Sequence, residues 1–315
     1  MRKACMQCVY ELAKQDPRII YIGSDVGAGT LDELKIERPD QFIMEGVSEQ
    51  HVIGMAAGLA KEGFIPYVNT IATFITRRCF EQIVVDCCLH NLPIRLIGNG
   101  GGLVYAPLGP THQAIEDISI MRSLPNMTVV AVSDADEMKR FMMQTPSVPG
   151  PIYIRLAKGG DPIVSSEKES FCIGKAILLR KPGEVLLITS GIMAHSALRA
   201  ADELFKKDIK AGVLNMHTIK PLDVESLVYF ASKVSMIVTV EEHIRIGGLG
   251  SAVLEALNDH YDGPMPIVKR LGLPDQFIDE YGSQESMLEG FGLQSVGIAN
   301  SVLENMNIIL ETSHV

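Results

Sequence analysis

Residues 46–60 read Gly-Val-Ser-Glu-Gln-His-Val-Ile-Gly-Met-Ala-Ala-Gly-Leu-Ala. This stretch predicts a helix that carries one acid, Glu49, in its first turn and is otherwise mostly apolar or very small. An acid on a tightly packed helix is costly unless it has a partner, although a first-turn carboxylate can simply offset the helix dipole. Gly54, Ala57 and Gly58 leave room against the helix for a planar group or another backbone. The stretch therefore predicts either a dipole-compensating Glu49 or a binding site built around it.

The composition is that of a globular chain with two domains. It has 315 residues, of which 47% are hydrophobic, and a mean hydropathy of +0.18, which suits two proper cores. No apolar run is long enough to span a bilayer, and residues 1–5 do not resemble a secretory leader. The net charge is −10 and there is no dense Lys/Arg block, so we expect neither a nucleic-acid nor a membrane partner.

Six cysteines occur in the chain. Cys5 and Cys8 have the spacing of a redox motif, but they fall in an expected opening helix with no strand before it. No second Cys pair or His pair completes a zinc site, so we expect no metal site in this chain. We expect ordinary buried or half-buried thiols and a reducing, cytoplasmic compartment. The same expectation covers the other four cysteines, Cys79, Cys87, Cys88 and Cys172.

Strand-like runs alternate with helix-like runs along the chain. The expected strands are 19–23, 93–98, 127–132, 151–156, 184–189, 212–216 and 235–240, and the expected helices include 133–142, 200–204 and 251–257. This alternation predicts an α/β fold with two parallel-sheet domains. Residues 158–174 are polar and contain Gly and Pro, which predicts a linker between a domain at 1–165 and another at 175–315.

Three glycine-rich stretches, residues 23–29, 98–102 and 247–250, follow expected strands. None has the dinucleotide pattern G-x-G-x-x-G or the P-loop pattern. Each is either a tight strand-to-helix connection or a place where the backbone closely approaches a ligand at the carboxyl end of a strand.

Residues 99–113, Asn-Gly-Gly-Gly-Leu-Val-Tyr-Ala-Pro-Leu-Gly-Pro-Thr-His-Gln, are too rich in Gly and Pro for regular structure. A long loop inside a compact enzyme is usually functional. His112 stands near its end, although a loop histidine is more often solvated than catalytic.

Four segments resemble the transketolase family of thiamine-diphosphate-dependent enzymes. Residues 46–50 resemble the family's Gly-Ile-Ser-Glu-Gln segment, residues 109–113 its Asp-Gly-Pro-Thr-His-Gln motif, and residues 70–75 its Thr-Phe-x-x-Phe segment. Residues 241–253, with Glu-Glu-His and Gly-Gly-Leu-Gly-Ser-Ala-Val, are typical of the transketolase carboxy-terminal domain. The resemblance implies a thiamine-diphosphate pyrimidine-binding domain followed by a transketolase C-terminal domain.

The resemblance also implies roles for single residues. Glu49 would hydrogen-bond the aminopyrimidine ring of thiamine diphosphate and favour its reactive tautomer. Phe74 would pack on that ring, with Ile71 in place of the family's first aromatic residue. His112 would contact the sugar, and a two-carbon ketol unit would pass from a ketose to an aldose.

Two arginines are expected to bind an anionic end of the substrate, because a guanidinium pair suits a phosphate or sulfonate. Arg155 closes an expected buried strand, where a guanidinium needs an anionic or hydrogen-bonded partner. The spacing from Arg2 to Asp25 matches the family's spacing between a phosphate-binding Arg and its Gly-Ser-Ala-Asp motif.

No Gly-Asp-Gly motif occurs in the chain. In full-length transketolases this motif belongs to an earlier domain, which binds the diphosphate and a magnesium ion. The resemblance therefore implies the carboxy-terminal subunit of a split transketolase, inactive alone. A separate amino-terminal subunit would hold the diphosphate and most of the Mg²⁺ coordination, and the two would form an α2β2 assembly.

Three departures from the family pattern predict a non-standard sugar specificity. Leu108 replaces an Asp that recognises a sugar hydroxyl, Gly100 replaces a phosphate-contacting His, and Gly29 replaces a Ser. Three alternatives stay open: the beta subunit of a 2-oxoacid dehydrogenase, a deoxyxylulose-phosphate-synthase-like enzyme, and a non-catalytic scaffold subunit. The first is disfavoured because residues 109–113 and Arg155 follow the sugar-binding pattern.

Overall fold

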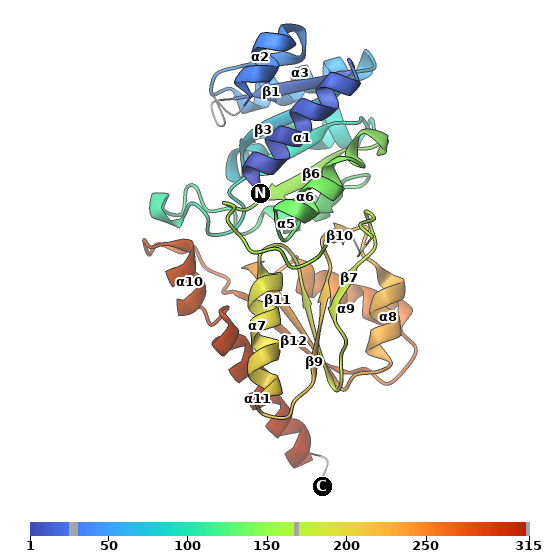
Figure 1. The fold of residues 1–315 in the computed structure, drawn as a ribbon, viewed down its shortest axis with the longest axis vertical. Coiled ribbons are helices and arrows are strands. Elements are labelled where there is room, and N and C mark those ends of the chain that lie inside the picture. Colours follow the sequence, from blue (N-terminus) through green and yellow to red (C-terminus); the bar gives the residue numbers. More distant parts are fainter. Residues whose placement is uncertain (25–30, 167–169, 313–315) are drawn as a thin grey trace.

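The computed structural model describes residues 1–24, 31–166 and 170–312. It consists of two α/β domains that lie end to end (Figure 1). Each is built on its own sheet, one of seven strands and one of five, and most neighbouring strands are parallel. The expected α/β class with two parallel-sheet domains is confirmed.

The first sheet has the strand order β10-β5-β6-β4-β3-β1-β2. Its strands are β1 (Ile19–Gly23), β2 (Phe42–Met44), β3 (Ile65–Ile71), β4 (Arg95–Asn99), β5 (Thr128–Val130), β6 (Ile152–Leu156) and β10 (Thr218–Lys220). Strand β10 comes from the second half of the chain and runs antiparallel to β5. The two halves of the chain therefore share a sheet edge as well as an interface.

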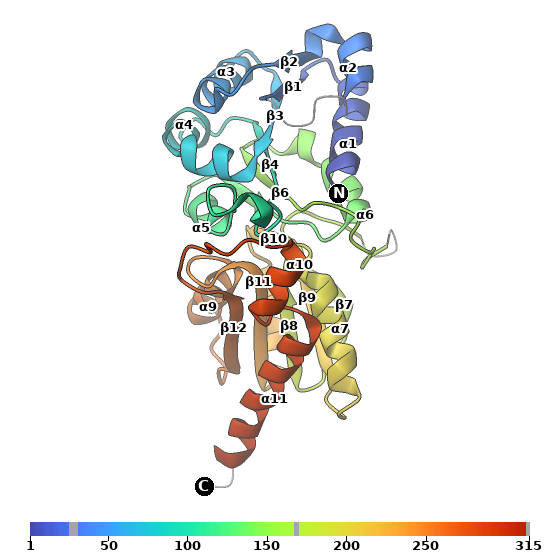
Figure 2. The same ribbon diagram turned by 90° about the vertical axis from the view of Figure 1, so that its left-hand side faces the viewer.

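Helices cover both faces of this sheet, which explains why its strands are buried apolar runs. Figure 2 shows α1, α2 and α6 on one face and α3, α4 and α5 on the other. Their bounds are α1 (Arg2–Gln15), α2 (Asp32–Glu37), α3 (Glu49–Lys61), α4 (Phe80–Gln82), α5 (Asp117–Arg122) and α6 (Ala135–Met142). Two π-helical turns, η2 (Phe74–Arg78) and η3 (Ile83–Cys88), flank α4, and 3-10 turns lie at η1 (Pro39–Gln41), η4 (Ala106–Leu108) and η5 (Thr145–Ser147).

The second sheet has the order β12-β11-β8-β9-β7, and its edge strand β7 is antiparallel to β9. Its strands are β7 (Ile177–Arg180), β8 (Val185–Thr189), β9 (Ala211–Asn215), β11 (Met236–Ile244) and β12 (Ile267–Leu273). In Figure 1, α7 and α11 lie on one side of this sheet and α8 and α9 on the other. The helices are α7 (Met193–Phe205), α8 (Val224–Ala231), α9 (Leu249–His260), α10 (Gln284–Gly290) and α11 (Ser295–Thr312).

All seven expected strands are present, although β11 continues to Ile244. Strand β3 was not expected, yet it lies in the middle of the first sheet. Its sequence, Ile-Pro-Tyr-Val-Asn-Thr-Ile, interrupts the apolar pattern with Pro66, Asn69 and Thr70. The two polar side chains form hydrogen bonds inside the sheet. Asn69 donates to the Tyr21 hydroxyl at 2.9 Å, and Thr70 accepts from the Ser24 hydroxyl at 2.8 Å.

Five of the six thiols are buried, as expected, and Cys172 is exposed, which was not. Burial raises the pKa of Cys8 to about 11 and that of Cys79 to about 12, so both are protonated at neutral pH. Within the described residues, we find no helix with the length and apolar character needed to cross a membrane.

Arg155, in β6, is buried where the two domains meet. Its Nε donates to Oδ2 of Asp117 at 2.8 Å, and its Nη2 donates to the carbonyls of Ala114 at 3.1 Å and Glu242 at 2.9 Å. The Tyr153 hydroxyl donates to the same Asp117 oxygen at 2.7 Å. Burial opposes the charge, but the carboxylates of Asp117 and Glu242 outweigh it and raise the pKa of Arg155. This one side chain joins β6, the loop before α5, and β11 of the second domain.

The Glu-Glu-His segment at 241–243 completes the junction. Glu242 Oε1 accepts from the Leu103 N–H at 2.9 Å and from Gln284 Nε2 at 2.7 Å. His243 Nε2 accepts from the Ser119 N–H at 3.2 Å, and burial lowers the pKa of His243 to about 4, which keeps the ring neutral. The second domain is therefore fastened to both ends of the segment between Leu103 and Ser119.

We predict that Arg155→Ala lowers the free energy of unfolding by about 3–5 kcal/mol, because it leaves the fully buried Asp117 carboxylate without its cation. Urea unfolding followed by circular dichroism measures the change. Arg180→Ala is the matched control, since it breaks an exposed pair with Asp202 that should contribute at most about 1 kcal/mol. A similar small loss for both variants would contradict the prediction.

Candidate functional site

Glu49 begins α3, the helix expected from residues 46–60. Its carboxylate is only 3% exposed, and its Oε2 accepts a hydrogen bond from Nη1 of Arg78 at 2.6 Å. The carboxylate also lies in the first turn of a helix, where the dipole favours negative charge. The buried acid therefore has the partner that its position required.

Phe74 provides a flat face beside this acid. Strand β3 ends at the half-buried Ile71, and Phe74 opens the π-helical turn η2. The guanidinium carbon of Arg78 lies 4.4 Å from the centre of the Phe74 ring. One planar, hydrogen-bonding group thus stacks on Phe74 and pairs with Glu49 at the same time.

His112 meets the same ring from its edge. The ring centres of Phe74 and His112 are 5.3 Å apart with an interplanar angle of 65°. Thr73 Oγ1 donates to the His112 carbonyl at 3.0 Å, which fastens the histidine to the turn that carries Phe74. The structure therefore brings Glu49, Phe74 and His112 into one site, while their roles remain predictions.

Arg77 and Arg78 are site residues that the sequence analysis missed. Arg77 Nη2 donates to the carbonyls of Thr111 and Gln113, each at 3.3 Å, and its Nε pairs with Glu116 at 3.0 Å. The sequence feature that could have indicated them is a pair of adjacent arginines three and four residues after Phe74.

The glycines of the loop are explained by close packing against protein side chains. A Cβ at Gly100, where φ is +75°, would collide with the Tyr105 ring, and one at Gly102 would collide with the Glu242 carboxylate. A histidine at position 100 would therefore not fit this loop. The backbone is closely approached here, and the groups that approach it are the side chains of Tyr105 and Glu242.

Leu108 and the aromatic side chain of Tyr281 lie on the open side of this loop. Leu108 ends turn η4 and is 53% exposed, and Tyr281 is 72% exposed. The Tyr281 ring lies about 3.0 Å from where a Cβ on Gly109 would stand. Because Gly109 directly follows Leu108, the exposed Leu108 and Tyr281 belong to neighbouring segments.

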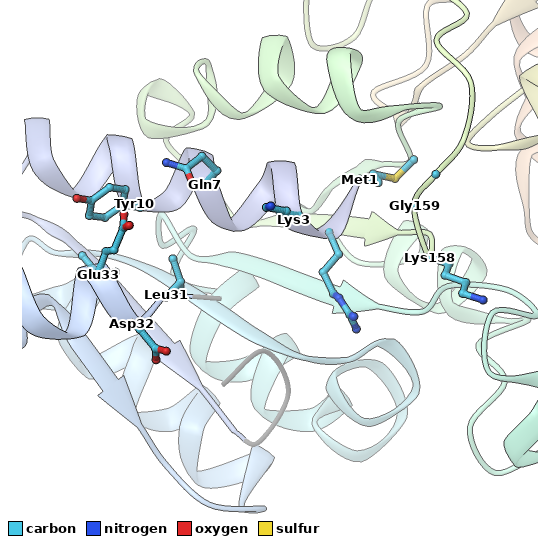
Figure 3. Close-up of a pocket in the computed structure, with 12 residues that line it drawn as sticks. Met1, Lys3, Gln7, Tyr10, Leu31, Asp32, Glu33, Lys158 and Gly159 are labelled. Atoms are coloured by element: carbon cyan, nitrogen blue, oxygen red, sulfur yellow. The ribbon is translucent and has the colours of Figure 1, made fainter. Parts of the chain in front are cut away.

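Arg2 lines a surface pocket of about 780 Å³ at the start of α1 (Figure 3). Lys3 and Lys158 line it as well, together with the acids Asp32 and Glu33. Lys158 was not expected here, although it comes two residues after the end of β6. The expected partner Asp25, like Gly29, lies outside the described residues.

Arg155 does not join Arg2 in this pocket. Its guanidinium is buried and bonded to Asp117, Ala114 and Glu242. The expectation of a hydrogen-bonded anionic partner is met by Asp117 at the domain junction, while the expected contact of Arg155 with a substrate anion stays a prediction.

The outer face of α3 is open. Gly54 and Gly58 are exposed, and a Cβ on either would have no atom within 4 Å, whereas Ala57 packs inward. Val47, just before the helix, is 67% exposed. This small-residue face, on the side of α3 that is turned away from the buried Glu49, leaves room for another backbone.

Two family models match the chain. One, described as "Transketolase, pyrimidine binding domain", matches residues 1–160, and the other, "Transketolase, C-terminal domain", matches residues 174–298.

Among curated proteins, a 1-deoxy-D-xylulose-5-phosphate synthase of Synechococcus sp. (strain JA-2-3B'a(2-13)) is 41% identical over 297 residues, which are 93% of this chain and 45% of that protein. The chain thus spans about half the length of such relatives. The "6-deoxy-6-sulfo-D-fructose transketolase subunit SqwH" of Clostridium sp. (strain MSTE9) is 36% identical over 98% of this chain and 95% of its own length.

Among solved structures, one described as "Split gene transketolase, inactive beta4 tetramer" has a TM-score of 0.88 and 35% identity, and covers 96% of this chain and 97% of its own. A transketolase variant of Pichia stipitis has a TM-score of 0.79 at 19% identity and covers 96% of this chain and 45% of its own. The latter shows the fold alone.

We predict that Arg77→Ala increases amide hydrogen exchange in residues 109–114, because the variant loses both bonds to the Thr111 and Gln113 carbonyls. Hydrogen–deuterium exchange with mass spectrometry measures this. Arg18→Ala, which breaks an exposed pair with Asp16 elsewhere in the same domain, should leave the loop unchanged. Equal exchange in wild type and Arg77→Ala would show that other contacts fix the loop.

Proposed function

The chain belongs to the transketolase family, and we propose that it is the subunit of a thiamine-diphosphate-dependent transketolase that holds the pyrimidine half of the cofactor. One observation carries this proposal. The Arg78 guanidinium, a planar hydrogen-bond donor, stacks on Phe74 and bonds to the buried Glu49. The same acceptor and the same flat face suit an aminopyrimidine ring.

Thiamine diphosphate, when bound, supplies the electron sink for breaking and making a carbon–carbon bond. The chain's residues place and polarise it: Glu49 accepts a hydrogen bond from the ring, and Phe74 supports the ring's face. His112, at the edge of Phe74, is placed to donate a hydrogen bond to a substrate oxygen. The reaction is transfer of a two-carbon ketol unit from a ketose to an aldose.

We propose that the site is completed by a separate amino-terminal subunit, which binds the diphosphate and most of the Mg²⁺ coordination shell. Two observations support it. The chain matches only about half of the synthases' length but nearly all of a protein named as a transketolase subunit. The open face of α3 at Gly54 and Gly58 offers a packing surface on the helix that begins with Glu49. We expect an α2β2 assembly in the cytoplasm.

The proposed substrate ends in an anion, phosphate or sulfonate. Arg2, Lys3 and Lys158 line one pocket, and a relative is named for a sulfo-fructose, which supports an anionic terminus. Leu108 offers no hydrogen bond to a sugar hydroxyl, so discrimination at that hydroxyl should be weak.

A second candidate is a deoxyxylulose-phosphate-synthase type of reaction, favoured by the 41% identity. A 1-deoxy sugar lacks the first hydroxyl, so its two-carbon unit would come from a 2-oxoacid rather than a ketose. Product analysis with a ketose donor and with pyruvate, using the same aldose phosphate acceptor, decides between the two reactions.

We predict that Glu49→Gln assembles with the amino-terminal subunit but loses about 100-fold or more in turnover, a loss typical of removing a group that acts in the transition state. Gln keeps the shape but not the charge. Ketol transfer is measured with each chain alone and with the mixture, and assembly by size-exclusion chromatography. Full turnover of the mixed variant would exclude Glu49 as catalytic and leave the scaffold interpretation, and robust activity of this chain alone would refute the split site.

We predict that Arg2→Ala and Lys158→Ala each raise KM about tenfold for a ketose with a terminal phosphate or sulfonate, since a charge-assisted contact contributes about 1.5 kcal/mol or more. KM for an unphosphorylated ketose should not change. Lys14→Ala, at the far end of α1, is the control. Equal effects on charged and neutral ketoses would show that this pocket does not bind the anion.

A further inference from the structure

We infer that Arg78 is a place-holder for the aminopyrimidine ring: its side chain must leave Glu49 and Phe74 before the cofactor can bind. The isolated chain therefore holds its own pyrimidine site closed. The inference rests on the proposed function, in which Glu49 and Phe74 receive that ring.

The contacts of Arg78 coincide with those the ring would need. Its Nη1 uses the Oε2 of Glu49 at 2.6 Å, and its guanidinium covers the Phe74 face at 4.4 Å. Aromatic rings and guanidinium groups stack at similar separations. A ring on this face of Phe74 and the guanidinium cannot occupy the same space.

Burial shows from which side the site is covered. The Glu49 side chain is 3% exposed, whereas that of Arg78 is 43% exposed. Arg78 thus lies on the solvent side of the acid. Its removal would open Glu49 toward solvent without disturbing the core.

The backbone can stay in place while the side chain leaves. Gln50 Nε2 donates to the Arg78 carbonyl at 3.0 Å, and the Cys79 thiol donates to the Phe74 carbonyl at 3.5 Å. These bonds hold turn η2 independently of the guanidinium. Opening the site therefore requires only a rotation of the Arg78 side chain into solvent.

The competing interpretation is that Arg78 stays on Glu49 in the working site and orients it. The two interpretations predict opposite changes in the affinity for the pyrimidine ring when the Arg78 side chain is removed. A place-holder lowers the fraction of molecules competent to bind, so its removal tightens binding. An orienting residue improves the site, so its removal weakens binding.

The test uses the full chain and a probe that lacks the diphosphate, 4-amino-5-hydroxymethyl-2-methylpyrimidine. The probe is titrated by ligand-observed NMR into wild type, Arg78→Ala, Arg78→Met and Glu49→Gln. Arg78→Met keeps an apolar stem near Phe74, so it removes the ion pair with less loss of packing. Arg18→Ala, which breaks the exposed pair with Asp16, controls for the loss of one positive charge.

We expect Arg78→Ala to bind the probe about tenfold more tightly than wild type, which corresponds to about 1.4 kcal/mol. Arg78→Met should shift in the same direction, and Arg18→Ala should not shift. Raising the salt concentration should tighten binding to wild type more than to Arg78→Ala, because salt weakens the partly exposed pair.

Unchanged or weaker probe binding by Arg78→Ala, or no detectable binding up to the solubility limit, would overturn the inference. The double variant Glu49→Gln/Arg78→Ala is titrated alongside the others, and if it loses binding that Arg78→Ala retains, the proposed role of Glu49 survives that outcome. If Glu49→Gln binds the probe as wild type does, the proposed function itself fails. The two failures are therefore distinguishable.

Discussion

The buried ion pair between Arg155 and Asp117 fixes the geometry on which the candidate site depends. Burying two charges is costly, and the cost is offset only when the remaining donors and acceptors are also satisfied. Arg155 meets part of this condition by donating to the carbonyls of Ala114 and Glu242, and Asp117 Oδ2 also accepts from Tyr153, whereas Asp117 Oδ1 has no hydrogen-bond partner among the described residues. The same guanidinium therefore pins the end of the glycine-rich loop and the second domain at one point. His112, two residues before Ala114, is held beside Phe74 by the bonds from Thr73 and Arg77 to the same loop.

The glycine-rich loop packs closely against that junction. Gly101 has no room for a side chain because Arg155 lies against it, and Gly102 has none because of Glu242. Once the loop is packed this closely, Gly100 cannot become a histidine without displacing Tyr105. Basic side chains also line the pocket at the start of α1, where Arg2, Lys3 and Lys158 lie.

Much of the fold and part of the site could be predicted from the sequence. The parallel strands were predictable because both faces are covered, and Glu49, Phe74 and His112 were predictable because each stands in a local motif. Strand β3 was missed because Asn69 and Thr70 satisfy their polar groups only through Tyr21 and Ser24, a tertiary fact. The place of Arg155 at the domain junction could not be predicted, because nothing local shows that Asp117, 38 residues away, pairs with it. The β10 pairing across the domains was likewise invisible in local periodicity.

Arg78 illustrates a general constraint on a buried acid near a surface. Such an acid is costly to leave unpaired. A long side chain with a partly hydrated guanidinium is well suited to cover such an acid temporarily, because it can return to water with little loss. The exposure of the pair agrees: the acid is buried and the arginine is not. In the structure, the Arg78 side chain thus supplies the hydrogen-bonded cation that the buried Glu49 carboxylate requires.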